Sequence, residues 1–323
     1  MVSKRVLGIL LVSLCLVAVN QGPVLAGDYP DKPISLIIPF GAGGSHDLNA
    51  RVFSSIIHEY LGQPIIVKLM PGAGGQKGTA AGARAKPDGY TLLFTHNYLD
   101  QLQPQVEKLP YDTTKDLVTV CRLNYSTSFQ IVLADKPWKN LEDVLAYARK
   151  NPGKLKVGHS GKWGASFVPE AFVFSKAKVD VRFLGYRGGG PMFQAVLAGE
   201  VDYGSASAIT CLGYIKQGKI RAIVAVGSER SPDVPDVPSL GELGYTDDVM
   251  HRIVLAPRGI PADRLKVLRE AFKKLSKNKT FTRMMAKLGE NPKTYMDGPE
   301  YEKVRAKQKK EYLELIKEIT GQK

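Results

Sequence analysis

The chain has 323 residues, of which 44% are hydrophobic and 24% charged, and it carries a formal net charge of +14. This composition is that of a folded globular protein long enough for two domains of ordinary size. Basic residues are scattered among acidic ones, and the basic C-terminal tail lacks interleaved aromatic residues, so nucleic acid is not an expected partner. A basic field instead favours an anionic small molecule.

The first 26 residues have the three-part pattern of a secretory signal peptide. Lys4 and Arg5 precede an apolar run at 6–19, and Val-Leu-Ala at 24–26 offers small residues for cleavage. The run is shorter than the roughly 20 residues that span a bilayer. We therefore predict that residues 1–26 are removed from an exported protein, which leaves 323 − 26 = 297 residues with a formal charge of 14 − 2 = +12.

Cysteine and histidine spacing gives no sign of redox or metal chemistry. After cleavage Cys121 and Cys211 remain, and they are too far apart for a CxxC pair. They could form a bridge in an oxidising compartment, but burial as two small hydrophobic side chains is favoured. The histidines show no HExxH-type spacing, so neither a metal nor a cofactor is expected.

The first predicted elements alternate between strand and helix. ISLIIPF at 34–40 is a short apolar strand, and the apolar residues of 48–61 recur on one face of a helix. A strand at 65–70, a small helix rich in Ala and Gly, and a strand at 90–95 follow. The βαβαβ order is typical of a parallel sheet.

A second alternating set follows and predicts a second lobe. Its strands are expected at 129–134, 155–160, 181–186 and 220–227, with helices between them at 140–153, 169–175, 192–200 and 211–219. A Pro-rich segment at 231–245 then leads back to a strand at 252–257 and to helices from about 262 and 298. We predict lobe 1 at 27–127 and 251–323, and lobe 2 at 128–250.

Two similar glycine-rich loops each stand between a strand and a helix. They read PFGAGGSHD at 39–47 and PGAGGQKGT at 71–79. Glycine lets backbone N–H groups approach a ligand closely, and a helix start adds partial positive charge, so both loops are candidate anion sites. The alternative is that both are only tight turns.

Familiar nucleotide and hydrolase motifs do not fit these loops. The first loop lacks the third glycine of GxGxxG, and the second has Lys77 before Gly78 where a phosphate-binding loop has glycine before lysine. No GxSxG motif is present. Capture of a carboxylate remains the interpretation.

The sequence resembles the periplasmic solute-binding subunits of tripartite tricarboxylate transporters, the Bug or TctC family. The resemblance is carried by segments that include YPDKPISLIIPFGAGGSHD, KPDGYTLL, YRGGGPMFQAVLAGEVD and LAPRGIPAD. It implies a type II-like periplasmic binding protein with two α/β lobes, each a mostly parallel sheet flanked by helices. It also implies a monomer without enzymatic activity that closes on a carboxylated solute and presents it to membrane permease subunits.

The same resemblance places candidate ligand contacts on both lobes. In lobe 1 they are Phe40, Gly43, Gly44, Ser45, His46 and Asp47 in the first loop, Gly74, Gly75 and Gln76 in the second, and Thr95 and Asn97 after the third strand. In lobe 2 they are Ser160, Trp163, Ser166, Arg187, Asp202 and Ser205.

Several of these residues have two interpretations. Asp47 either contacts the ligand or acts as a carboxylate favoured by the helix start. Arg187 either pairs with a carboxylate or faces solvent. Trp163 is either exposed, where it would stack on a ligand, or packed into its own lobe. His251 and Arg252 stand where relatives tend to have an aromatic residue.

The expected function is therefore binding of an organic acid, with aromatic acids and tricarboxylates among the candidates. One alternative is an exported hydrolase-like enzyme, which needs a nucleophile and a base on one cleft. Ser160 and His159 are adjacent in sequence, so a strand would point them to opposite faces. A second alternative is a ligand-sensing partner of a signalling receptor.

Overall fold

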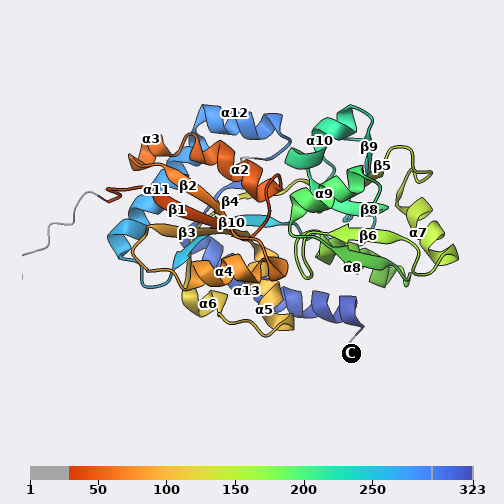
Figure 1. Cartoon of the computed structure of the whole chain (residues 1–323), viewed down its shortest axis with the longest axis horizontal. Coiled ribbons are helices and arrows are strands. Elements are labelled where there is room, and N and C mark those ends of the chain that lie inside the picture. The colour runs from red at the N-terminus through yellow and green to blue at the C-terminus, as the bar shows by residue number, and fades with distance from the viewer. Residues whose placement is uncertain (1–28, 292–293, 322–323) are drawn as a thin grey trace, which may run out of the picture.

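The computed structural model describes residues 29–291 and 294–321, so the predicted signal peptide lies outside the described residues. Two sheets with flanking helices lie side by side along the long axis of the molecule (Figure 1). Among the described helices, none combines the length and the apolar character that crossing a bilayer requires.

Lobe 1 is built on a six-stranded mixed sheet in the order β11-β4-β10-β3-β1-β2. Its strands are β1 (Ile34–Ile38), β2 (Ile65–Leu69), β3 (Thr91–His96), β4 (Leu117–Tyr125), β10 (His251–Pro257) and β11 (Met296–Asp297). The β1, β2 and β3 strands pair in parallel, whereas β10 runs antiparallel to β3 and β4.

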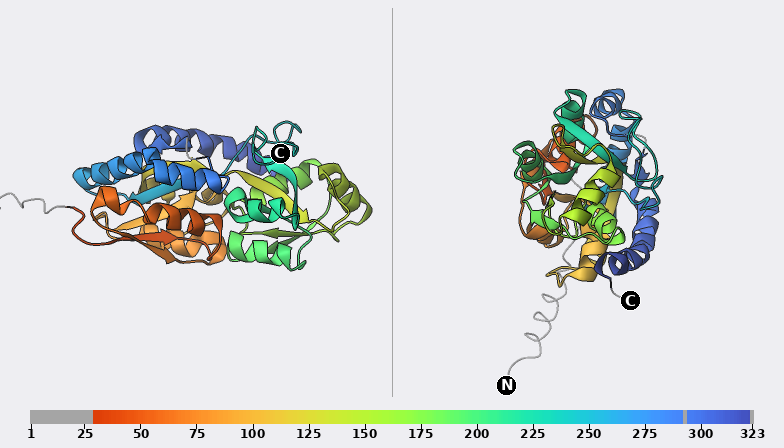
Figure 2. Two further views of the ribbon diagram at one scale, coloured as in Figure 1. Left: turned by 90° about the horizontal axis from the view of Figure 1, so that it is seen from above. Right: turned by 90° about the vertical axis from the view of Figure 1, so that its right-hand side faces the viewer.

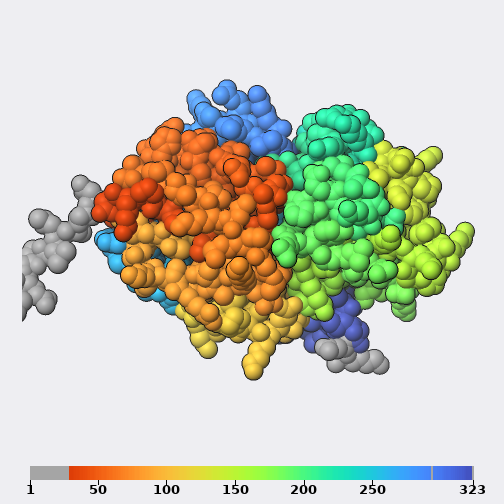
Figure 3. All heavy atoms as spheres, in the orientation of Figure 1, coloured from red at the N-terminus to blue at the C-terminus, as the bar shows by residue number. Residues whose placement is uncertain are grey.

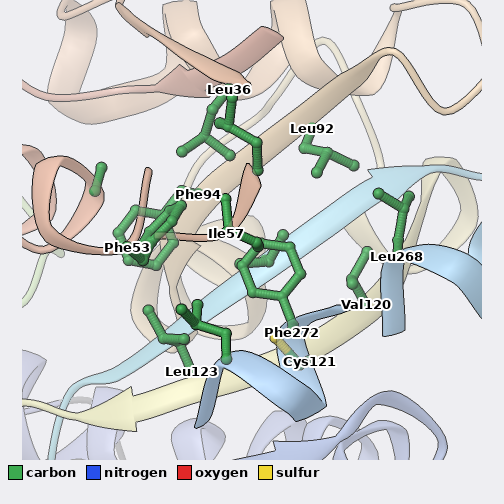
Figure 4. Packing of buried hydrophobic residues seen from close by; sticks show 14 of the residues in the cluster. Leu36, Phe53, Ile57, Leu92, Phe94, Val120, Cys121, Leu123, Leu268 and Phe272 are labelled. Carbon is green, nitrogen blue, oxygen red and sulfur yellow. The ribbon is translucent and has the colours of Figure 1, made fainter. Parts of the chain in front are cut away.

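The helices of lobe 1 surround this sheet. They are α2 (Ser45–Ser54), α3 (His58–Leu61), η1 (Ala73–Gly75), α4 (Gln76–Ala83), η2 (Tyr98–Leu102), α5 (Gln103–Val106), α6 (Thr113–Asp116), α11 (Ala262–Lys277), α12 (Lys279–Lys287) and α13 (Gly298–Thr320). A buried cluster that includes Leu36, Phe53, Phe94 and Phe272 fills the space between the sheet, α2 and α11 (Figure 4).

Lobe 2 has a five-stranded sheet in the order β7-β6-β8-β5-β9. Its strands are β5 (Ser128–Leu133), β6 (Lys156–His159), β7 (Arg182–Gly185), β8 (Tyr203–Ser207) and β9 (Ile220–Val226), and its helices are α7 (Leu141–Lys150), α8 (Phe167–Lys176), α9 (Gly189–Leu197) and α10 (Ala208–Lys216). The β5 strand lies between β8 and β9 and is antiparallel to both.

The α7 helix shows how local sequence sets these elements. The side chain of Asn140 caps it by accepting a hydrogen bond of 2.9 Å from the amide of Asp143. Leu141, Val144 and Ala148 recur on one helical face and are buried against the sheet. The helix therefore begins where the cap stands and packs through one apolar face, as its sequence predicts.

The fold prediction is confirmed in its class, two α/β lobes with helices around each sheet, and it missed several parts of lobe 1. The strand β4 was not predicted, and α12 was not separated from its neighbours. Cys121 and Cys211 are both unbridged and buried, in the cores of different lobes, so their predicted burial is confirmed.

Two connections join the lobes, and the last helix spans both. Residues 126–127 connect β4 to β5, and the segment 227–250 returns from β9 to β10. The α13 helix starts beside β4 and β11 and ends against α8 of lobe 2, where Ser175 donates a hydrogen bond of 3.0 Å to the carbonyl of Glu318 (Figure 2). The predicted boundaries between the lobes stay a prediction.

A buried ion pair fixes α13 to lobe 1. The Arg305 guanidinium makes two hydrogen bonds of 2.7 Å to the carboxylate of Asp100 in η2, and a third of 2.9 Å to the carbonyl of Thr113. Asp100 and Arg305 are 1% and 3% exposed. Loss of one partner would leave the other charge buried without compensation.

We therefore expect Arg305→Met to lower the free energy of unfolding by about 3 to 5 kcal/mol, the range for breaking a buried pair. The matched control is Lys307→Met on the same helix, because the Lys307 side chain is 78% exposed and pairs with Glu311 at the surface. That control should change stability by less than about 1 kcal/mol. Urea denaturation followed by circular dichroism measures both, and equal effects would contradict the anchoring role.

Candidate functional site

A cavity of about 50 Å³ lies between the lobes. One water requires roughly 10 to 15 Å³ on this measure, so the space suits a few waters or a small organic molecule. Its lining residues are Phe40, Gly44, Ser45, His46, His96, Ser128, Ser160, Ala165, Ser166, Gly189, Ser205, Ala206, Ser207, Thr210 and Met250. Among these described residues, none is Lys, Arg, Asp or Glu.

Four helices begin at this cavity, and each presents its N-terminal end. The first residues or caps that line it are Gly44 and Ser45 for α2, Ser166 for α8, Gly189 for α9, and Ser207 for α10. A helix start has unpaired N–H groups and partial positive charge. The cavity is therefore suited to an anion that is held by neutral donors.

The first glycine-rich loop supplies backbone donors from its helical end. The amides of Ser45 and His46 have no hydrogen-bond partner among the described residues, as expected for the first turn of α2. The amide of Gly43 is already occupied, because it donates to the Asp47 carboxylate at 2.9 Å. Asp47 also pairs with Arg51 at 3.0 Å and is absent from the cavity lining, so its placement fits the interpretation of a carboxylate favoured by the helix start.

Two neutral histidines form the aromatic side of the cavity. Phe40 stacks on His96 with ring centroids 5.1 Å apart, and His46 lies 5.5 Å from His96. Burial lowers the pKa of His46 well below its usual value, with smaller effects from His96 and Arg252. Burial likewise lowers the pKa of His96 to about 3. Both rings are uncharged at neutral pH, and the buried Nε2 atom of His46 has no partner among the described residues.

The second glycine-rich loop lines a neighbouring cavity instead. Gly74, Gly75 and Arg187 border a space of about 240 Å³ that shares only Phe40 and Ser160 with the first cavity. The amide of Gly75 donates to the carbonyl of Gly72 at 3.0 Å. The two loops therefore do not converge on one cavity in this closed arrangement.

Other predicted contacts support the fold around the cavity. Gln76 donates a hydrogen bond to Glu107, and Thr95 is buried in β3. Asn97 donates to the carbonyl of Val249 at 3.0 Å and accepts from the amide of His251 at 2.9 Å, which ties lobe 1 to the returning connection.

Of the two interpretations of Trp163, the one that leaves its side chain exposed is wrong. The side chain is 7% exposed and meets Phe167 edge-on at 5.5 Å, in an apolar cluster that includes Tyr98 and Tyr312 of lobe 1. Burial against η2 and α13 removes its large apolar surface from water. Asp202 also lies apart from the cavity lining, because it pairs with Lys136 at 2.7 Å and accepts from the amide of Lys156.

Several cavity residues were not found in the sequence. They are Ser128, Ala165, Ala206, Ser207, Thr210 and Met250. One signal was available, because Ser207 stands at the same kind of strand-to-helix junction as the first glycine-rich loop. Ser128 carries no such signal, since it reaches the cavity only through the pairing of β5 with β8.

The lobes touch at the mouth of the site through backbone atoms. The amide of Gly41 donates to the carbonyl of Arg187 across the interface at 3.0 Å. Gly44 faces Gly190, where a Cβ added to Gly190 would lie 2.1 Å from the carbonyl oxygen of Ala42. Figure 3 shows the two lobes in contact along this seam. The described structure is thus a closed form.

Two α/β lobes joined by two connections, with a donor-lined cavity between them, define a periplasmic solute-binding protein. The model of the tripartite tricarboxylate transporter family receptor, TctC, matches residues 49–320, and the chain belongs to this family. The family resemblance predicted from the sequence is confirmed. Members of the family are solute receptors and not enzymes.

Three known proteins illustrate the similarity. A UPF0065 protein of Cupriavidus necator is 32% identical over 295 residues, 91% of this chain and 89% of that protein. The periplasmic binding protein BugD superposes with a TM-score of 0.85 at 26% identity, covering 90% of this chain and 99% of that one. MatC of Rhodopseudomonas palustris, solved with bound malate, gives 0.82 at 26% identity, covering 89% and 100%.

The glycine contact between the lobes gives a direct test of closure. We expect Gly190→Ala to favour the α9 helix, because alanine is the better helix former, and yet to hold the lobes apart through its clash with Ala42. Ligand affinity should fall at least about tenfold without loss of melting temperature. Calorimetry and small-angle scattering measure the two effects.

The matched control is Gly213→Ala, which places the same methyl group on helix α10 where no atom lies within 4 Å. It should raise stability slightly and leave affinity and ligand-induced compaction unchanged. Normal binding by the Gly190→Ala protein would contradict the assignment of this seam as the closure contact.

Proposed function

We propose that the protein captures a small organic acid between its lobes in the periplasm and delivers it to the permease subunits of a tripartite tricarboxylate transporter. The observation that carries the proposal is the convergence of four helix N-termini and several serine hydroxyls on one cavity without a lysine or arginine. Neutral donors of this kind stabilise a carboxylate at a helix start.

The lining of the cavity favours a short acid over an aromatic one, because it is rich in hydroxyl groups. The large indole that was expected to stack on a ligand is packed into the interlobe cluster instead. MatC, a relative of similar fold, was solved with malate, which has the chemistry that this lining would accept.

The hydrolase alternative has no support in the geometry. Ser160 bonds to Ser166 at 2.8 Å, and His159 accepts from the amide of Gly161 at 3.2 Å. No histidine within the described part of the chain makes a hydrogen bond to a serine of the cavity, so no nucleophile is paired with a base.

The test of the proposed function uses protein that begins at residue 27. Malate, succinate, citrate, benzoate and glutamate are compared by thermal shift and then by calorimetry, with dimethyl succinate as the uncharged control. Binding to the folded state raises the melting temperature by mass action. We expect a short di-acid to bind and the ester to have no effect. Binding of the ester, or of no acid in the panel, would overturn the proposal.

The neutral histidines predict how affinity depends on pH. Since the pKa values of His46 and His96 lie below the range tested, the affinity for malate should stay within about twofold between pH 8 and pH 6.5. A charged His46 would instead strengthen binding of the anion as pH falls. Calorimetry at three pH values measures this, and a rise of tenfold at pH 6.5 would contradict the neutral assignment.

A further inference from the structure

Arg252 lies behind the cavity and is 0% exposed. Its two terminal nitrogens pair with both carboxylate oxygens of Glu290, at 2.7 and 3.0 Å. One of those nitrogens also donates to the hydroxyl of Ser126 at 3.0 Å. Arg252 therefore reaches the connection between the lobes, although it does not line the cavity.

Ser126 connects Arg252 to two hydroxyls that do line the cavity. Its oxygen lies 2.8 Å from that of Ser128 and 2.7 Å from that of Ser207. Ser128 and Ser207 are 3.4 Å apart, so their stronger contacts are both with Ser126. The three hydroxyls form a short chain that runs from the buried guanidinium to the ligand space.

The number of donors and acceptors limits the direction of hydrogen bonding along this row of three hydroxyls. A serine hydroxyl has one hydrogen and two lone pairs, and a guanidinium only donates. Arg252 fills one lone pair of Ser126, so Ser126 accepts from at most one neighbouring serine. Its own hydrogen then has the other serine within 2.8 Å, closer than the alternative acceptor, the carbonyl of Thr127 at 3.5 Å. The serine that receives this hydrogen keeps its own hydrogen free for the cavity.

We propose that Arg252, acting through Ser126, sets the direction of this chain so that Ser128 or Ser207 presents a hydrogen to the ligand. The site thereby selects ligands with an acceptor, such as a carboxylate, and Arg252 is a positioning residue for specificity. This inference rests on the proposed function and adds to it a residue outside the cavity. Without Arg252, both lone pairs of Ser126 are open, so both serines can donate to it, and a ligand then has to break one of those bonds.

The charge of Arg252 offers a competing explanation, because it lies close enough to lower the pKa of both cavity histidines. The two explanations differ in whether Ser126 is needed. A relay through Ser126 disappears when that hydroxyl is removed, whereas the effect of a charge or of packing persists.

The experiment is therefore a double-mutant cycle measured by calorimetry with malate as the probe. Arg252→Met with Glu290→Gln removes the ion pair as a unit and keeps the formal net charge unchanged. The same pair change is then made together with Ser126→Ala. Melting temperature and circular dichroism confirm that each of the four proteins is folded.

We expect the pair change to weaken malate binding about tenfold when Ser126 is present and less than about twofold when Ser126→Ala is also present. Equal losses in the two backgrounds would overturn the relay. If wild-type protein binds none of the acids of the panel, the proposed function fails instead, and the two failures are thus distinguished.

Arg252→Lys gives a second route if the pair variant does not fold. Its single ammonium keeps the charge beside Glu290 but cannot occupy both terminal nitrogen positions of the guanidinium. We expect the same loss of malate affinity and the same suppression by Ser126→Ala. Full affinity in the folded Arg252→Lys protein would count against the inference.

Discussion

The close approach of four glycines at the mouth of the site is the constraint on which the closed structure depends. Gly41, Gly44, Gly188 and Gly190 bring backbone against backbone, and one hydrogen bond from Gly41 to Arg187 crosses the seam. A Cβ at Gly188 would lie 2.7 Å from the amide nitrogen of Gly41. Because the approach is this close, the helix starts of both lobes reach the same small space. The recognition chemistry thus follows from the closure geometry.

A second constraint is that the described residues lining the cavity include no Lys, Arg, Asp or Glu. Two buried ion pairs, Arg252 with Glu290 and Arg305 with Asp100, lie outside the lining, which is made of hydroxyls, amides, apolar groups and uncharged rings. An ammonium or guanidinium in so small a space would need a partner in the unliganded protein. Neutral donors avoid that cost, because they can bond to water before the ligand arrives.

The sequence predicted those parts of the site that depend on local order. The glycine-rich loop and the start of α2 follow from residues next to a strand end, whereas Ser160, Ser166 and Ser205 were implied by the family resemblance and line the cavity. The burial of Trp163 could not be predicted, since η2 and α13, which cover it, lie in distant parts of the sequence. The pairing of Arg252 with Glu290 could not be predicted either, because only the fold brings the two side chains together. Features that depend on neighbouring residues were therefore predictable, whereas the strand order of the sheets and the contacts between distant segments were not.

The place of β10 in its sheet has a consequence for the order of assembly. This strand lies between β3 and β4, yet it is made only after all of lobe 2 has been synthesised. The sheet of lobe 2, by contrast, is complete within one continuous stretch of chain. Contacts between distant segments form slowly, because a long loop must close first. Lobe 2 can therefore reach its final strand pairing first. The later addition of β10 and α13 then completes lobe 1 and joins the two lobes.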